Sequence, residues 1–229
     1  MAPHTQLIVA LDLDSLNDAR KLVTDLGDSV TWYKVGKQLF TRYGPHAVTA
    51  LKDMGKKVFL DLKFHDIPNT VAQAVRSAAS LGADMTNVHA GGGPAMLRAA
   101  AESAQDCELI LVAVTVLTSM DTDELHSVGV TVSPEKQVLR LARLAQNQGV
   151  HGVVCSGHEI APLRQACGDR FVLVVPGIRP ATSQHGDQKR VMTPADAARA
   201  GADYIVVGRP IRAAADPVAA AHAVAAELT

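Results

Sequence analysis

The chain has 229 residues, a formal net charge of −1 at pH 7 and 3% aromatic residues. This length suits one α/β barrel, the balanced charge excludes a general attraction to nucleic acid or membrane surfaces, and the scarcity of aromatic side chains argues against a base-stacking surface. The three cysteines are odd in number and lack zinc-site spacing, which indicates a reducing compartment.

Apolar segments alternate with alanine-rich segments along the whole chain. The expected strands are Leu7–Asp12, Trp32–Gly36, Val58–Lys63, Met85–Ala90, Leu109–Leu117, Gly152–Ser156, Phe171–Gly177 and Tyr204–Gly208. The expected helices are Leu16–Leu26, Ala47–Met54, Val71–Leu81, Pro94–Ala104, Pro134–Gln148, Ala161–Ala166, Pro194–Ala200 and Pro217–Leu228. Such near-continuous apolar strands are typical of a parallel sheet that is covered on both faces.

Strands that alternate with helices in this way predict an α/β fold of the (β/α)₈ TIM-barrel type, with a single domain over residues 1–229. The tripeptide Gly-Ala-Asp occurs at 82–84 and at 201–203, and each copy ends an expected helix and begins a strand. The alternative is an open doubly wound sheet. Its usual G-x-G-x-x-G turn is missing here, because Asp12-Leu13-Asp14-Ser15 follows the first strand.

The ends and apolar runs of the chain bear on its location. The opening residues M-A-P-H-T-Q lack the basic head and apolar core of a signal peptide. The apolar run Leu109–Leu117 is too short to cross a bilayer. We therefore expect a soluble, cytoplasmic protein that has a small-molecule substrate and no nucleic-acid or membrane partner.

Charged residues interrupt the apolar segment V-F-L-D-L-K-F-H-D-I-P-N-T at 58–70. Residues two apart in a strand share a face, so Asp61 and Lys63 should both point toward the barrel axis, and Asp66 follows in the loop. Lys34 and Asp12 lie near the ends of the two preceding strands. Because an isolated buried charge is costly, these side chains should converge and pair at the end of the barrel where active sites are built.

Two other interpretations of these charges remain open. They could form a purely structural salt-bridge network, although such networks contribute little to stability. They could instead bind a metal ion through Asp61, Asp66, His65 and His89, but the ammonium of Lys63 would compete with a cation in the same space. We expect no metal.

Residues after the last two expected strands suggest a phosphate site. Gly208 permits close approach of the backbone, and Arg209 and Arg179 offer forked cationic donors where barrels usually bind phosphate. A Gly-Arg pair alone could also be a surface turn. The polar segment Arg179–Arg190 is long for this kind of loop, so we predict a mobile loop that closes over the phosphate, with a plain disordered excursion as the alternative.

The run D-L-K-F-H-D-I-P-N-T at 61–70 resembles the signature of the orotidine 5′-phosphate decarboxylase family. The resemblance spans the chain and is strongest to the bacterial branch. Further matching segments are A-L-D at 10–12, K-V-G-K at 34–37, N-V-H-A at 87–90, V-T-V-L-T-S-M at 114–120, P-G-I-R-P at 176–180, G-D-Q at 186–188 and V-G-R-P at 207–210.

The resemblance implies a homodimeric barrel enzyme that converts orotidine 5′-monophosphate to uridine 5′-monophosphate in pyrimidine biosynthesis, without a metal or an organic cofactor. Loss of CO₂ from C6 leaves a carbanion that no adjacent carbonyl group delocalises well. The chain has no motif for a cofactor that could accept these electrons. Electrostatic stabilisation by a positioned ammonium group is therefore the expected mechanism.

The family pattern assigns roles to matching residues of this chain. Lys63 is implied to donate the proton to C6, and Asp61 faces the substrate carboxylate. Lys34 pairs with the carboxylates and contacts the ribose, which Asp12 also binds.

The remaining implied contacts involve the base and the neighbouring subunit. Asp66 is implied to reach the site of the neighbouring subunit and to touch its ribose, and Thr70 belongs to the same segment. Thr118 and Ser119 lie against the pyrimidine, and Gln188 bridges the base and the phosphate from the loop. The phosphate itself is bound by Arg179, Arg209 and the backbone of Gly208.

Two other functions fit part of this pattern. A sugar-phosphate decarboxylase or aldolase of a related barrel family shares a D-x-K-x-x-D strand, and such enzymes typically need Mg²⁺. A non-catalytic barrel that binds phosphonucleotides is the other alternative, against which the complete Asp61, Lys63 and Asp66 set argues.

Overall fold

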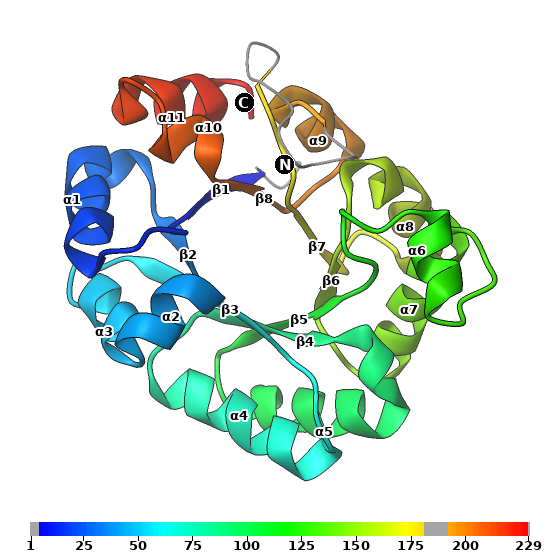
Figure 1. Cartoon of the computed structure of the whole chain (residues 1–229). Coiled ribbons are helices and arrows are strands. Elements are labelled where there is room, and N and C mark those ends of the chain that lie inside the picture. The colour runs from blue at the N-terminus through cyan, green and yellow to red at the C-terminus, as the bar shows by residue number, and fades with distance from the viewer. Residues whose placement is uncertain (1–4, 181–191, 229) are drawn as a thin grey trace.

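Eight parallel strands close into a barrel in which each strand pairs with the next one in the chain and β8 pairs with β1 (Figure 1). The computed structural model describes residues 5–180 and 192–228. The strands are β1 (Gln6–Ala10), β2 (Trp32–Gly36), β3 (Lys57–Phe64), β4 (Met85–His89), β5 (Ile110–Val114), β6 (Gly152–Val154), β7 (Val172–Val175) and β8 (Tyr204–Val207). The predicted (β/α)₈ barrel is confirmed.

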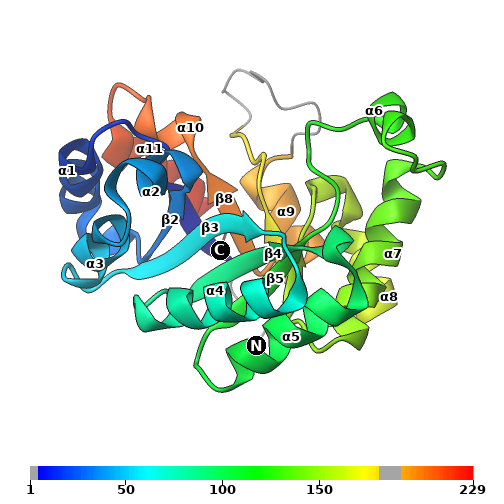
Figure 2. The same cartoon turned by 60° about the horizontal axis from the view of Figure 1, so that its bottom comes forward.

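A ring of helices covers the outside of the barrel (Figure 1). In the described ranges they are α1 (Leu16–Leu26), α2 (Lys37–Tyr43), α3 (His46–Lys52), α4 (Pro68–Ser80), α5 (Gly93–Gln105), α6 (Thr122–Ser127), α7 (Pro134–Asn147), α8 (Ile160–Cys167), α9 (Pro194–Ala200), α10 (Arg209–Arg212) and α11 (Pro217–Ala226). α4 and α5 lie side by side in both views (Figure 1 and Figure 2). Within residues 5–180 and 192–228, no helix has the length and apolar character needed to cross a membrane.

Three short helices, α2, α6 and α10, go beyond the sequence-based expectation. α6 nevertheless carries a local signal, a capping box at its first turn. The side chain of Asp121 accepts a hydrogen bond from the Glu124 amide at 3.1 Å, and the Glu124 carboxylate accepts one from the Asp121 amide at 3.0 Å. A D-x-x-E spacing is typical of a helix start.

The expected strand Leu109–Leu117 is too long. β5 ends at Val114, and the apolar residues Val116 and Leu117 continue into the loop, where they line a pocket. The last apolar residues of the run therefore line a pocket and do not pair as a strand. A buried strand and a pocket-lining loop leave the same apolar pattern in a sequence.

Apolar side chains fill the interior of the barrel toward its amino-terminal end. The inner cluster of buried residues consists of Ile8, Ala10, Trp32, Phe59, Met85, Val112, Val174 and Val206. The rings of Trp32 and Tyr204 meet edge to face with centroids 5.2 Å apart, and Lys57 Nζ lies 5.3 Å from the Trp32 ring centre. All three begin strands, so side chains fill the barrel interior at this end, and the active sites of such barrels lie at the opposite end.

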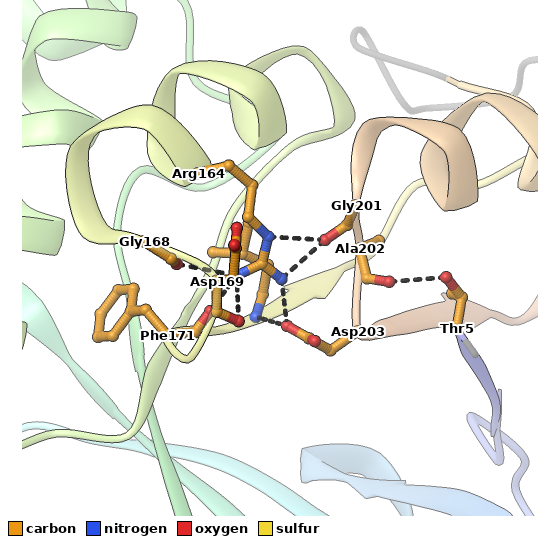
Figure 3. A network of polar contacts seen from close by, with 9 residues as sticks. Thr5, Arg164, Gly168, Asp169, Phe171, Gly201, Ala202 and Asp203 are labelled. Atoms are coloured by element: carbon orange, nitrogen blue, oxygen red, sulfur yellow. Dashed lines mark hydrogen bonds and ion pairs between the residues drawn. The ribbon is translucent and has the colours of Figure 1, made fainter. Parts of the chain in front are cut away.

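Outside the barrel, the second Gly-Ala-Asp sequence lies at the centre of a polar network (Figure 3). Asp203, just before β8, accepts a hydrogen bond from the Leu173 amide at 2.7 Å and forms an ion pair with Arg164 of α8. Arg164 also donates through Nε to the Gly201 carbonyl oxygen at 2.9 Å. One guanidinium group thus joins α8, the end of α9 and the start of β8.

The first Gly-Ala-Asp sequence is used in the same way four strands earlier. Asp84, just before β4, accepts a hydrogen bond from the Val58 amide at 2.8 Å and pairs with Lys52 of α3 at 2.7 Å. The tripeptide therefore marks one structural device that recurs in the two halves of the barrel.

Candidate active site

Four charged side chains meet at the carboxyl ends of β1 to β3. Lys34 Nζ lies 2.8 Å from Asp12 Oδ1 and 3.4 Å from Asp61 Oδ2. The ammonium group of Lys63 pairs with the other oxygen, Oδ1, of Asp61. Acidic and basic groups therefore alternate in the order Asp12, Lys34, Asp61 and Lys63, and each inner member has an opposite charge on both sides.

Burial and pairing act in opposite directions on the two innermost groups. Burial alone would lower the pKa of Lys34, but the charges of Asp61 and Asp12 and the hydrogen bonds to both carboxylates hold that pKa above its ordinary value. Burial alone would raise the pKa of Asp61, but the charges of Lys34 and Lys63 and hydrogen bonds from Lys63 and Asn87 hold it below its ordinary value. Both groups are therefore ionised at neutral pH.

The backbone of β3 is irregular where it presents Lys63. Lys63 has a φ of 56°, the only positive value among the non-glycine residues of the described ranges. The register between β3 and β4 shifts between Leu60 and Phe64. A left-handed conformation of this kind costs on the order of 1–3 kcal/mol and persists where its surroundings enforce it, often at an active site. The regular alternation assumed from the sequence does not predict this backbone.

A pocket that is partly open to solvent lies beside these charges. The strands β2 to β4 supply its polar wall, which consists of Lys34, Asp61, Lys63 and Asn87. The later strands and their loops supply a mostly apolar wall: Val114, Val116, Leu117, Thr118, Val154, Cys155, Pro176 and Val206. The pocket thus suits a flat ring with one ionic edge.

Several predicted site residues do not line this pocket in the single chain: Asp12, Asp66, Thr70, Ser119, Arg179, Gly208 and Arg209. Asp66 and Thr70 are exposed between β3 and the first turn of α4, and the Asp66 carboxylate accepts a hydrogen bond from the Ile67 amide at 2.6 Å. Ser119 is exposed, whereas its neighbour Thr118 lines the pocket. The cross-subunit role of Asp66 stays a prediction.

The predicted phosphate residues follow the last two strands. Arg179 comes after β7 and is 8% exposed, while Gly208 and Arg209 come directly after β8. Burial and the nearby positive charge of Arg209 hold the pKa of Arg179 below its ordinary value. Two neighbouring guanidinium groups at this end of a barrel suit an anionic ligand. Gln188 and the predicted loop beyond residue 180 lie outside the described residues.

Two histidines lie at the same end of the barrel. The rings of His65 and His89 are in contact, with centroids 5.6 Å apart. Burial, followed by the positive charges of His65, Lys63 and Lys37, holds the pKa of His89 below its ordinary value. In the part of the chain that the structure describes, no three His, Cys, Asp or Glu side chains form a group that could hold a metal ion. Asp61, a candidate ligand, is instead paired with two lysines.

Several residues that line the pocket are not among the predicted site residues, including Phe59, Asn87, Val154, Cys155, Pro176 and Val206. Asn87 had a detectable signal, because Met85 on the same strand lies inside the barrel and residues two apart share a face. A polar residue at an inward position near the end of a strand is unusual for a core. The apolar members have no such signal, since they cannot be told from core residues.

A closed (β/α)₈ barrel with paired charges beside a pocket at the carboxyl ends of its strands defines a TIM-barrel enzyme. The profile of the orotidine 5′-phosphate decarboxylase / HUMPS family matches residues 5–224. The chain therefore belongs to this family.

Individual relatives agree with the family profile over nearly the whole length. The chain is 53% identical to the orotidine 5′-phosphate decarboxylase of Moorella thermoacetica, with 100% of this chain and 94% of that protein covered. It is 54% identical to the enzyme of the same name from Chromohalobacter salexigens, over 98% and 96% of the two chains. The crystal structure of orotidine 5′-phosphate decarboxylase from Lactobacillus acidophilus matches with a TM-score of 0.87 at 39% identity, over 98% and 99%.

Proposed function

We propose that this protein decarboxylates orotidine 5′-monophosphate to uridine 5′-monophosphate, a step of de novo pyrimidine biosynthesis. The observation that carries the proposal is the ammonium group of Lys63, which Asp61 holds at the edge of a pocket with an apolar far wall. Membership of the family over residues 5–224 and the activity named for relatives of 53% and 54% identity support the same reaction.

The two walls of the pocket suit two parts of this substrate. The pyrimidine ring lies against the apolar wall with Thr118 beside it, because removing the faces of the ring from water against apolar side chains is favourable. The carboxylate on C6 then faces Asp61 and Lys63 on the polar wall. Asp12 and Lys34, at the outer end of the charged row, bind the ribose hydroxyl groups.

The chemistry uses Lys63 twice. The bond between C6 and the carboxylate carbon breaks, its electron pair stays on C6 as a carbanion, and CO₂ leaves. The ammonium of Lys63 is already in place beside C6, so it stabilises the developing negative charge without reorganising. It then donates a proton to C6, which gives uridine 5′-monophosphate and leaves a neutral amine that regains a proton from solvent.

Asp61 holds this ammonium in position. A mobile ammonium would have to reorganise during the reaction, which would slow the step. Asp61 also repels the substrate carboxylate, at a cost of roughly 4 kcal/mol for charges ~4 Å apart at an effective dielectric of ~20. We treat this repulsion as secondary to the stabilisation of the carbanion.

The phosphate group supplies binding energy away from the reacting carbon. Arg179, Arg209 and the backbone of Gly208 bind it at the ends of β7 and β8. Gln188 bridges the base and the phosphate from the loop Arg179–Arg190, which closes over the bound substrate. Closure excludes water and lets contacts to the phosphate favour the reactive arrangement.

Two copies of the chain form the working enzyme in this proposal. Asp66 and Thr70 lie on an exposed segment together with Ile67, which is 67% exposed. Their exposure in the single chain leaves these residues accessible to a second copy. Asp66 of each copy then completes the ribose site of the other.

The decisive experiment follows the loss of orotidylate absorbance in the presence of a chelator. Wild type should turn over the substrate, and Lys63→Ala should lose about four orders of magnitude in kcat, since it removes both the proton donor and the stabilising charge. Lys21→Ala is the matched control, because Lys21 pairs with Asp25 on the surface of α1. Circular dichroism would confirm that both variants fold.

Each contrary result points to a different alternative. Near-normal activity of Lys63→Ala would reject its role as donor. Activity that disappears with the chelator would favour a Mg²⁺-dependent sugar-phosphate enzyme. Binding of the nucleotide without turnover by the wild type would indicate a non-catalytic barrel.

A further inference from the structure

Asn87 connects Asp61 and Lys63, the last two residues of the charged row. It lies in the middle of β4, is 1% exposed and lines the pocket. Its Nδ2 donates a hydrogen bond to Asp61 Oδ1 at 2.7 Å, and its Oδ1 accepts one from the backbone amide of Lys63, also at 2.7 Å. One buried amide group therefore holds the carboxylate of one residue and the main chain of the other.

The chemistry of the partners fixes the orientation of this amide. The backbone amide of Lys63 can only donate, and the ionised carboxylate of Asp61 can only accept. Asn87 must therefore present its oxygen to Lys63 and its nitrogen to Asp61, because the flipped orientation would lose both hydrogen bonds. A side chain with one acceptor and one donor at this spacing is required, and a carboxylate of the same shape would not serve.

Asn87 also occupies the gap left by the irregular part of β3. Leu60 pairs with Thr86 and Phe64 pairs with Val88, so four steps along β3 correspond to two steps along β4. Asn87 is the residue between these pairs, and its side-chain oxygen accepts the hydrogen bond from Lys63 where the regular ladder is interrupted. This contact lies at the one non-glycine residue of the described ranges with a positive φ.

From these contacts we propose that Asn87 is a positioning residue that holds the backbone of Lys63 in its left-handed conformation and orients Asp61 toward the Lys63 ammonium. This inference rests on the proposed function, since it concerns the geometry of the same reaction. Asn87 contributes no proton and no charge to the reaction. It acts through the other two residues, and its removal leaves the charges present but misplaced.

The electrostatic surroundings of Asp61 provide a readout that a purely structural role would not change. Asp61 is faced by Lys34 from β2, by Lys63 from its own strand and by His89 from β4, with Asp12 beyond Lys34. The hydrogen bond from Asn87 is one of the contacts that lower the pKa of Asp61. Its removal should raise that pKa, so the acidic limb of the kcat profile should move to higher pH.

Thr86 offers a matched control on the neighbouring position of β4. It is 0% exposed, and its hydroxyl donates a hydrogen bond to the Leu60 carbonyl oxygen of β3 at 2.9 Å. Thr86→Val therefore also removes a buried side-chain hydrogen bond between the same two strands. Thr86 does not line the pocket. Loss of its hydrogen bond should therefore lower stability without affecting the position of Lys63.

The experiment compares wild type with Asn87→Ala, Asn87→Asp and Thr86→Val by kcat, KM, the pH profile and thermal unfolding. Asn87→Ala should lower kcat by about 100-fold, the effect expected when a reacting group moves by about 1 Å, with a much smaller change in KM. Asn87→Asp preserves the volume of the side chain but loses the hydrogen-bond donor. It should therefore show the same loss of kcat, with a larger shift of the acidic limb of the kcat profile. Thr86→Val should keep kcat within about threefold even if its melting temperature falls.

The inference is overturned if an active wild type is accompanied by Asn87 variants whose kcat stays within about threefold, or whose acidic limb does not move. It is also overturned if Thr86→Val lowers kcat as much as the Asn87 variants do. Should Asn87→Ala fail to fold, the volume-matched Asn87→Asp decides by the same criteria. A wild type without decarboxylase activity would instead reject the proposed function itself.

Discussion

Gly36 leaves room for the outer ion pair of the candidate site. A Cβ atom built on Gly36 would lie 2.8 Å from Asp12 Oδ1 and 2.8 Å from Lys34 Nζ. The backbone there is extended, with φ −93° and ψ 179°, so it does not itself require glycine. The close approach of two charged groups is therefore the physical reason for a residue without a side chain.

We predict that Gly36→Ala lowers kcat/KM by about 100-fold, because it displaces the Asp12–Lys34 pair by roughly 1 Å. The fold should lose little stability, since both contacted atoms are the ends of flexible side chains. Steady-state kinetics and urea unfolding would test this. Gly91→Ala is the control, because nothing lies within 4 Å of its added Cβ. Unchanged kinetics of Gly36→Ala would show that the ion pair tolerates displacement.

At the scale of elements, the two Gly-Ala-Asp sequences hold the amino-terminal ends of neighbouring strands together. Both use an aspartate that accepts a backbone amide and pairs with a cation from an earlier helix, but the second copy has more hydrogen bonds and less exposed charges. The side chains of Arg164 and Asp203 are 15% and 19% exposed, against 31% and 26% for Lys52 and Asp84.

Arg164→Ala should therefore cost about 3 kcal/mol in the free energy of unfolding, as for a broken buried pair. Lys52→Ala should cost about 1 kcal/mol, as for a more exposed pair. Neither should change kcat, because both lie at the end of the barrel opposite the pocket. Urea unfolding and steady-state assays would check this. Equal losses of stability would contradict the role given to burial, and a fall in kcat would contradict the separation of the two ends.

For the whole molecule, the central question is whether two chains share one site. Lys63→Ala and Asp66→Ala should each be inactive alone. Mixed and allowed to exchange subunits, they should regain about one quarter of wild-type activity, because half of the dimers are mixed and each mixed dimer has one intact site of two.

Lys63→Ala mixed with Asp61→Ala is the control for this complementation. Both residues belong to the pocket of one chain, so this mixture should recover nothing. Sedimentation would establish whether the mixtures contain dimers. A monomeric wild type would contradict the proposal that Asp66 contributes to the site of the neighbouring subunit. So would a mixture of Lys63→Ala and Asp66→Ala that stays inactive.

The outline of the fold follows from the sequence because it depends on local patterns. β2, α1 and α9 have the expected bounds, since apolar runs and helix signals act over a few residues. The convergence of Asp12, Lys34 and the β3 charges also follows, because a closed parallel barrel brings all carboxyl ends to one side.

The precise form of the site was decided only by the tertiary structure. The left-handed backbone of Lys63, the role of Asn87 and the close approach at Gly36 depend on contacts between strands that are distant in sequence. The sequence by itself determined the barrel, the order of its elements and the charged residues at its mouth, because hydrophobic periodicity and side-chain chemistry are local properties. Only the packed barrel determined how those charges pair and which neutral residues hold them, because hydrogen bonds and steric limits arise from distances that no local pattern specifies.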